Sequence, residues 1–325
     1  MPERRSAFYS IPYPLTPNPY RTMTIPTRPL GKTGVNVSIL CLGGWHIGQP
    51  AIDADYERIM HAAIDEGITF FDNAWDYHEG RSEEIMGKAL ASGGRRQKVF
   101  LMTKNCGRDA ATSRQHLEDS LRRLQTDVID LWQFHEINYD NDPEWIVERG
   151  ALAAALEAQK AGKVRFIGFT GHKHPSIFLK MLPLHTWDTC QLPVNVCDYF
   201  YRSSIHEVIP ELKKRNIAPI GMKSLGGGNL ADGGRMVAGG VATAEECIRF
   251  SLSQDIASLV VGIDSMKVLM QDVAAARAFT PMAKDETDAL LARVKPVATD
   301  GRFEWSKSTQ NFDGPYHRRQ HGFAE

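Results

Sequence analysis

The sequence predicts a single (β/α)8 barrel, and three observations lead to that prediction. Eight short apolar segments alternate with helical patterns over about 230 residues, without a break in composition. Several of these segments end on a polar side chain, as parallel strands do where they carry a site. The early glycine-rich turn and the following acidic residue that would indicate a doubly wound sheet are missing.

Each expected strand is a short run of apolar, β-favouring residues. The eight runs are 39–42, 68–71, 99–103, 128–134, 165–170, 190–193, 218–222 and 259–262. The sixth run contains Pro193, which is unusual inside a strand because proline donates no ladder hydrogen bond.

Apolar residues between these runs recur at helical spacing. The pattern predicts helices at 56–66, 82–90, 152–161 and 244–254. Thr112 to Gln115 has the pattern of a capping box, which predicts another helix there. A further helix is expected to begin near Ser265.

The two ends of the chain differ from the barrel region. Residues 1–27 are rich in proline and are expected to form an extended arm, while 28–325 form the barrel with its tail. Residues 28–37 are expected to form a β-hairpin around a glycine-bearing turn. The tail after about Asp300 holds Phe303, Trp305, Phe312 and Tyr316, and we expect it to cover the mouth of the barrel.

The composition excludes several classes of protein. A net charge of −1 gives no support to a nucleic-acid or anionic-membrane partner. No apolar run approaches the ~20 residues that span a bilayer. Five scattered cysteines without a Cys-x-x-Cys pair fit a reducing cytoplasm rather than a disulfide framework or a zinc site. The sequence carries no signal for an oligomeric state.

Four polar residues stand at or just past the ends of consecutive expected strands. They are Asp72, Tyr77, Lys104 and His135. Singly, each has an ordinary structural explanation, such as a helix cap, a solvated lysine or a satisfied histidine. Four such residues in order at the carboxyl ends of neighbouring strands point instead to a chemical site.

This set resembles the catalytic tetrad of the aldo-keto reductases. The matching segments are Phe71-Asp72-Asn73-Ala74 with Tyr77, Gly80-Arg81-Ser82-Glu83, Thr103-Lys104 and Phe134-His135. The resemblance runs from about Arg28 to the helix after Gly262. It implies an NAD(P)H-dependent oxidoreductase that reduces an aldehyde or ketone, a small-molecule carbonyl substrate, to an alcohol.

The resemblance also implies a role for each member of the tetrad. Tyr77 would be the general acid, although a free phenol titrates near ~10. Lys104 would lower the pKa of that phenol, and Asp72 would be the counter-ion of the lysine. His135 would donate or accept a hydrogen bond at the carbonyl oxygen and orient the substrate.

Further residues are implied as cofactor and substrate contacts. The cofactor set is Gly44, Thr170, Gln191, Met222, Leu225, Gly226, Gly228, Gly262, Ser265, Lys267 and Asp272. Trp45 is expected against the substrate. NADP(H) is favoured and NAD(H) is the alternative, because Val268 stands where the family often has an arginine for the 2′-phosphate.

Other positions also depart from the family pattern. Asn73 replaces the usual threonine, Gly171 replaces an asparagine that holds the nicotinamide amide, and Met222 replaces a stacking aromatic. Thr170 can supply a hydroxyl at the nicotinamide, and His172 is a candidate replacement for the missing amide.

Two other functions remain open from the sequence. One is a non-catalytic, nucleotide-binding regulatory subunit of aldo-keto reductase type, against which the intact tetrad argues. The other is a barrel hydrolase or metal enzyme, for which His172 and His174 are the close histidine pair on an expected strand-end loop. No strand-end cluster of acidic residues completes that site.

Overall fold

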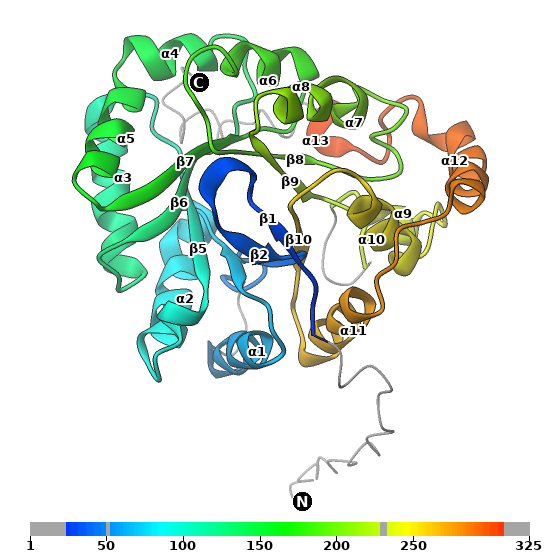
Figure 1. Ribbon diagram of the computed structural model, residues 1–325, viewed down its shortest axis with the longest axis horizontal. Coiled ribbons are helices and arrows are strands. Elements are labelled where there is room, and N and C mark those ends of the chain that lie inside the picture. Colours follow the sequence, from blue (N-terminus) through cyan, green and yellow to red (C-terminus); the bar gives the residue numbers. More distant parts are fainter. Residues whose placement is uncertain (1–23, 50–52, 228–232, 309–325) are drawn as a thin grey trace, which may run out of the picture.

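A closed barrel of eight parallel strands forms the centre of the molecule (Figure 1). The computed structural model describes residues 24–49, 53–227 and 233–308. The barrel strands are β3 (Leu40–Gly43), β4 (Phe70–Asp72), β5 (Phe100–Asn105), β6 (Ile129–Phe134), β7 (Val164–Thr170), β8 (Thr189–Pro193), β9 (Ala218–Met222) and β10 (Ser258–Gly262). They pair in chain order, and β10 closes the ring against β3. The predicted fold class is therefore confirmed.

Helices follow the strands and form the outer layer (Figure 1). They are α1 (Asp53–Asp65), α2 (Arg81–Ala91), α3 (Ala110–Arg123), α4 (Asp142–Glu148), α5 (Ala151–Lys160), α6 (Pro175–Met181), α7 (Ser204–Glu207), α8 (Ile209–Lys214), α9 (Arg235–Ala238), α10 (Ala244–Ser253), α11 (Met266–Arg277), α12 (Lys284–Ala298) and α13 (Trp305–Ser308). The expected helices correspond to α1, α2, α3, α5, α10 and α11. Their apolar sides are buried against the strands, which removes that surface from water.

The expected hairpin is present at the amino ends of the strands. β1 (Thr27–Pro29) pairs antiparallel with β2 (Asn36–Ser38) through a 3-10 turn, η1 (Gly31–Thr33). Leu30 is fully buried in a cluster that includes Phe70 and Phe100 of the barrel interior. The hairpin therefore closes this end of the barrel.

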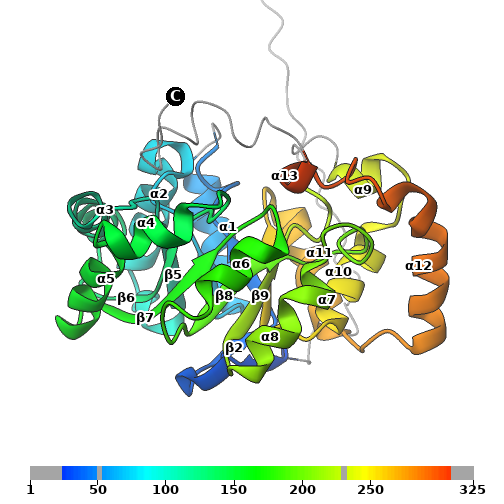
Figure 2. The same cartoon turned by 90° about the horizontal axis from the view of Figure 1, so that it is seen from above.

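The first residues of the tail lie at the opposite end of the barrel, where α13 packs (Figure 2). Lys307 forms a buried ion pair with Asp198, and Asn195 donates a hydrogen bond to Glu304 (2.9 Å). Asn195 and Asp198 follow the carboxyl end of β8. Residues 301–308 thus lie at the mouth, as expected, whereas Phe312 and Tyr316 lie outside the described residues, as does most of the expected arm.

One local prediction is wrong. Thr112 does not cap its helix, because α3 begins at Ala110 and Asp109 is the cap. The Asp109 carboxylate accepts from both the amide (2.9 Å) and the hydroxyl (2.7 Å) of Thr112. An aspartate that caps from one turn earlier competes with the Ser/Thr pattern, and sequence spacing did not separate the two.

Pro193 is the last residue of β8, so its missing amide interrupts no bond within the strand. All five cysteines are buried free thiols. Among the described residues, no helix is both long and apolar enough to cross a bilayer.

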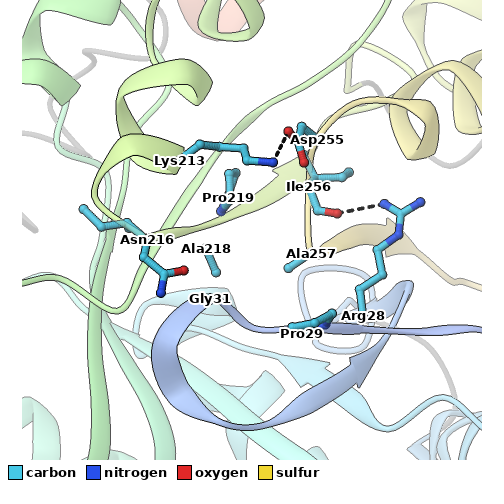
Figure 3. Close-up of a pocket in the computed structure, with 11 residues that line it drawn as sticks. Arg28, Pro29, Gly31, Lys213, Asn216, Ala218, Pro219, Asp255, Ile256 and Ala257 are labelled. Carbon is cyan, nitrogen blue, oxygen red and sulfur yellow. Dashed lines mark hydrogen bonds and ion pairs between the residues drawn. The ribbon is translucent and has the colours of Figure 1, made fainter.

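A cavity of about 260 Å³ lies beside the hairpin, at the amino ends of β9 and β10 (Figure 3). Arg28 reaches across it to the carbonyl of Ile256 (2.7 Å), and Lys213 pairs with Asp255. It is at the end of the barrel opposite the four residues of the expected tetrad.

Candidate active site

Lys104 is the centre of the site. It lies on β5 beside β4, which ends at Asp72. Its ammonium donates to Asp72 Oδ1 (2.5 Å), to the carbonyl of Asn73 (2.7 Å) and to the hydroxyl of Tyr77 (3.1 Å). The lysine and the aspartate are almost fully buried. A buried ammonium is stable only when its N–H groups have acceptors, and Lys104 has one for each of its three.

A glycine allows this close packing. A Cβ on Gly44 would lie 2.6 Å from the carbonyl oxygen of Asp72, closer than atoms can approach. The carbonyl of Gly44 accepts from the hydroxyl of Ser82 (2.6 Å). Gly44 therefore supports the end of β4, while its contact with a cofactor stays a prediction.

Burial affects the two acidic groups that face Lys104. It raises the pKa of the Asp72 carboxyl, and the Lys104 ammonium opposes that rise. Burial also raises the pKa of Tyr77 well above its usual value, with further contributions from Asp72, Asp76 and Glu136. The net direction is therefore opposite to the lowering that was expected from Lys104, and the largest cause is burial. Tyr77 keeps its proton.

Two aromatic rings flank the tyrosine. Tyr77 meets His135 edge to face, with ring centroids 5.5 Å apart. Trp45 meets Tyr77 in the same manner at 5.2 Å and remains 45% exposed. The carbonyl of Trp45 accepts from the ring of His78 (2.7 Å). Trp45 thus stands at the solvent edge of the tyrosine, where an incoming substrate would meet it.

Sequence reasoning missed Asp76. Its Oδ1 lies 2.8 Å from Nδ1 of His135, and both side chains are buried. The Sγ atom of Cys106 lies 3.6 Å from the same nitrogen. The three polar atoms lie within 4.8 Å of one another. The signal available was position alone, since Asp76 directly precedes Tyr77.

The histidine pair expected for a metal site takes two separate roles. His172 is buried, with its Nδ1 3.8 Å from a carboxylate oxygen of Glu136. His174 caps α6, where its ring accepts from the amide of Ser176 (3.2 Å). Each histidine thus has a partner of its own, and the described residues hold no metal-binding group that includes either of them.

Two polar side chains that are expected to bind the nicotinamide amide lie at the ends of β7 and β8. Thr170 and Gln191 are paired neighbours there. The hydroxyl of Thr170 is buried without a hydrogen-bond partner among the described residues, which marks it as available to a ligand. Gln191 is held by Gln133 (2.9 Å). A Cβ on Gly171 would meet the carbonyl of Ile137 at 2.6 Å, which explains why no asparagine stands at that position.

The end of β9 and the loop after it hold four members of the expected cofactor set. Met222 ends the strand and is largely buried, and Leu225 is half-buried. Gly226 has a φ of +77° and donates its amide to the carbonyl of Lys223 (2.9 Å). That amide is therefore already bonded within the turn. Gly228 lies outside the described residues.

The segment after β10 carries one group that suits a ligand. Gly262 packs under the ring of His46, and Ser265 caps α11 by accepting from the amide of Val268 (3.3 Å). Lys267 is exposed. Burial raises the pKa of Asp272 to about 7, assisted by Asp264. A buried carboxyl of this kind gains from a hydroxyl or amine donor.

Comparison with known proteins agrees with this geometry. The family model described as Aldo/keto reductase family matches residues 39–237, more than half of the chain. The chain belongs to the aldo/keto reductase family. Within it, the chain is 42% identical over 159 residues to the uncharacterized oxidoreductase YrpG of Bacillus subtilis (strain 168), an alignment that covers 43% of this chain and 47% of YrpG. The chain thus spans about half of that relative's length.

Two further comparisons extend over most of the chain. L-galactose dehydrogenase of Arabidopsis thaliana is 26% identical over 308 residues, which cover 83% of this chain and 96% of the relative. The structure of the aldo-keto reductase AKR11C1 from Bacillus halodurans aligns with a TM-score of 0.70 and 23% identity, covering 87% of this chain and 99% of the other. At that identity the structural likeness shows the fold alone.

Proposed function

We propose that this aldo/keto reductase catalyses NAD(P)H-dependent reduction of an aldehyde or ketone to an alcohol. One observation carries the proposal: a single buried ammonium, on Lys104, donates to both the Asp72 carboxylate and the Tyr77 hydroxyl. These are the groups that a reduction with an acid catalyst requires at one place.

A bound nicotinamide cofactor would supply the hydride. Thr170 and Asp272 fit such a group, because one offers an unused buried hydroxyl and the other a buried carboxyl. Gln191, Met222, the turn at Leu225 and Gly226, and the start of α11 would complete the binding surface.

Tyr77, Lys104 and Asp72 then have separate roles in the transfer of the proton. Tyr77 holds a proton in the resting site and gives it to the carbonyl oxygen. Lys104 stabilises the phenolate as it forms, since it already touches that oxygen. Asp72 accepts a hydrogen bond from the ammonium and positions it, and Trp45 shields one side of the tyrosine.

The alternative is a regulatory subunit that binds nucleotide without turning it over. It would need neither the hydrogen bond from Lys104 to Tyr77 nor a protonated phenol, so we favour the enzyme.

A panel of aldehydes and ketones, assayed for oxidation of NADPH and of NADH, tests the proposal. We expect steady turnover with at least one carbonyl and one cofactor, unchanged by a chelator. Tight nucleotide binding with no turnover across the panel would favour the regulatory subunit. Activity that a chelator abolishes and added metal restores would favour a metal enzyme.

A further inference from the structure

Three buried groups, one of them His135 of the tetrad, lie close together on three different loops. Asp76 follows β4, Cys106 follows β5 and His135 follows β6. Each is at most about 5% exposed. His135 Nδ1 is 2.8 Å from Asp76 Oδ1 and 3.6 Å from Cys106 Sγ.

The protons in this cluster can be assigned from its chemistry. An ionised carboxylate only accepts hydrogen bonds, so with Asp76 ionised the proton between Asp76 and His135 belongs to Nδ1. Burial raises the pKa of the Cys106 thiol well above its usual value, and the carboxylates of Asp76 and Glu136 add to this. The thiol therefore keeps its proton and is a second donor to Asp76.

This assignment limits what the other ring nitrogen can do. A neutral imidazole has one N–H, and here that N–H is at Nδ1. Nε2 of the neutral ring is then an acceptor and cannot donate to a carbonyl oxygen. It becomes a donor only when the ring is an imidazolium, whose charge the carboxylate of Asp76 would balance.

We propose that Asp76 is a positioning residue that holds the proton of His135 on Nδ1, so that His135 donates to the substrate oxygen only as an imidazolium. This rests on the proposed function, because it concerns the same carbonyl oxygen. Tyr77 remains the proton donor, and His135 polarises the carbonyl through a charged hydrogen bond without losing its own proton.

The other charged groups around His135 are accounted for within the fold. Lys104 is paired with Asp72, and Arg108 is paired with Asp142 (2.7 Å) while it donates to the carbonyl of His135. Glu136 lies near the ring of His172. Asp76 Oδ1, 2.8 Å from Nδ1, is in hydrogen-bond contact with the ring of His135.

Replacement by asparagine separates charge from shape. In Asp76→Asn the amide can turn and donate to Nδ1, which permits the neutral tautomer with its proton on Nε2. We expect carbonyl reduction to fall by about tenfold at pH 6, the scale of one charge-assisted bond.

The tautomer itself is measured by nitrogen NMR of the histidine ring, assigned with His135→Gln. We expect the neutral wild-type ring to carry its proton on Nδ1, the Asp76→Asn ring to carry it on Nε2, and Cys106→Ala and Asp76→Glu to resemble wild type. A wild-type proton on Nε2, or an unchanged tautomer in folded Asp76→Asn, would overturn the proposal. The NMR result needs no turnover, so it stands apart from failure of the proposed function.

Discussion

Lys104 Nζ lies 3.1 Å from the hydroxyl oxygen of Tyr77 while it is bound to Asp72 at 2.5 Å. One ammonium therefore joins a buried carboxylate to a phenol that burial keeps protonated. The pairing suits an acid catalyst: the proton is held until it is needed, and the charge that stabilises its loss is already in place.

Lys104→Met should abolish most turnover and also destabilise the fold. Removing one partner of a buried pair leaves Asp72 uncompensated, at a cost of about 3–5 kcal/mol in the free energy of unfolding. Urea unfolding and steady-state kinetics measure the two effects.

The double variant Lys104→Met/Asp72→Asn separates them. It should regain most of the stability and none of the turnover, since no buried charge remains but the ammonium is still missing. Recovery of turnover in the double variant would show that Lys104 acts only through stability.

Release of α13 should affect the substrate more than the nucleotide. Lys307 donates to Asp198 and to the carbonyls of Tyr201 (3.1 Å) and Arg202 (3.0 Å), which fixes the start of the tail at the mouth. Lys307→Met should raise KM for the carbonyl several-fold, with nucleotide Kd within about twofold. Exposed Lys295→Met is the matched control. Unchanged kinetics on several carbonyls would reject a substrate-facing tail.

Asp272 should make the fold less stable as pH rises. Its pKa is about 7 in the folded chain against 3.8 for the ordinary group. Between those values the folded state binds the extra proton, so the free energy of unfolding falls with rising pH. This difference of about three in pKa corresponds to about 2–4 kcal/mol in the free energy of unfolding, after allowance for relaxation. Asp272→Asn should remove this part of the pH dependence, seen by urea unfolding at pH 5 and pH 8, and an identical dependence in both proteins would refute the assignment.

Cofactor preference should be for NADPH, but weak. Lys267 is exposed at the start of α11 and is our candidate contact for a 2′-phosphate, while the charge of Asp264 would oppose a phosphate and Val268 stands in place of the usual arginine. A charge-assisted bond is worth about 1.5–3 kcal/mol, so Lys267→Ala should bring the Kd values for NADPH and NADH close together. If wild type binds NADH clearly more tightly, Asp264 or Asp272 holds the ribose hydroxyls instead.

The spacing of apolar residues along the sequence predicted the barrel strands, and the residues that follow the strands predicted the tetrad. All eight strands were found, because each is a short apolar run. Asp72, Tyr77, Lys104 and His135 follow from the ends of three of them. Asp76 was missed because its partner, His135, is 59 residues away and becomes a neighbour only when β4 and β6 join one barrel. Lys104 was expected to lower the pKa of Tyr77, whereas burial, which a sequence does not show, raises it.

The central claim is that Tyr77 gives the proton, and single-turnover reduction by Tyr77→Phe tests it most directly. With NADPH bound and a reactive aldehyde added, we expect hydride transfer to slow by at least ~10²-fold. Nucleotide Kd should stay within twofold, because the phenol is not among the proposed nucleotide contacts. Hydride transfer within a few-fold of wild type, in a folded Tyr77→Phe protein, would contradict the account.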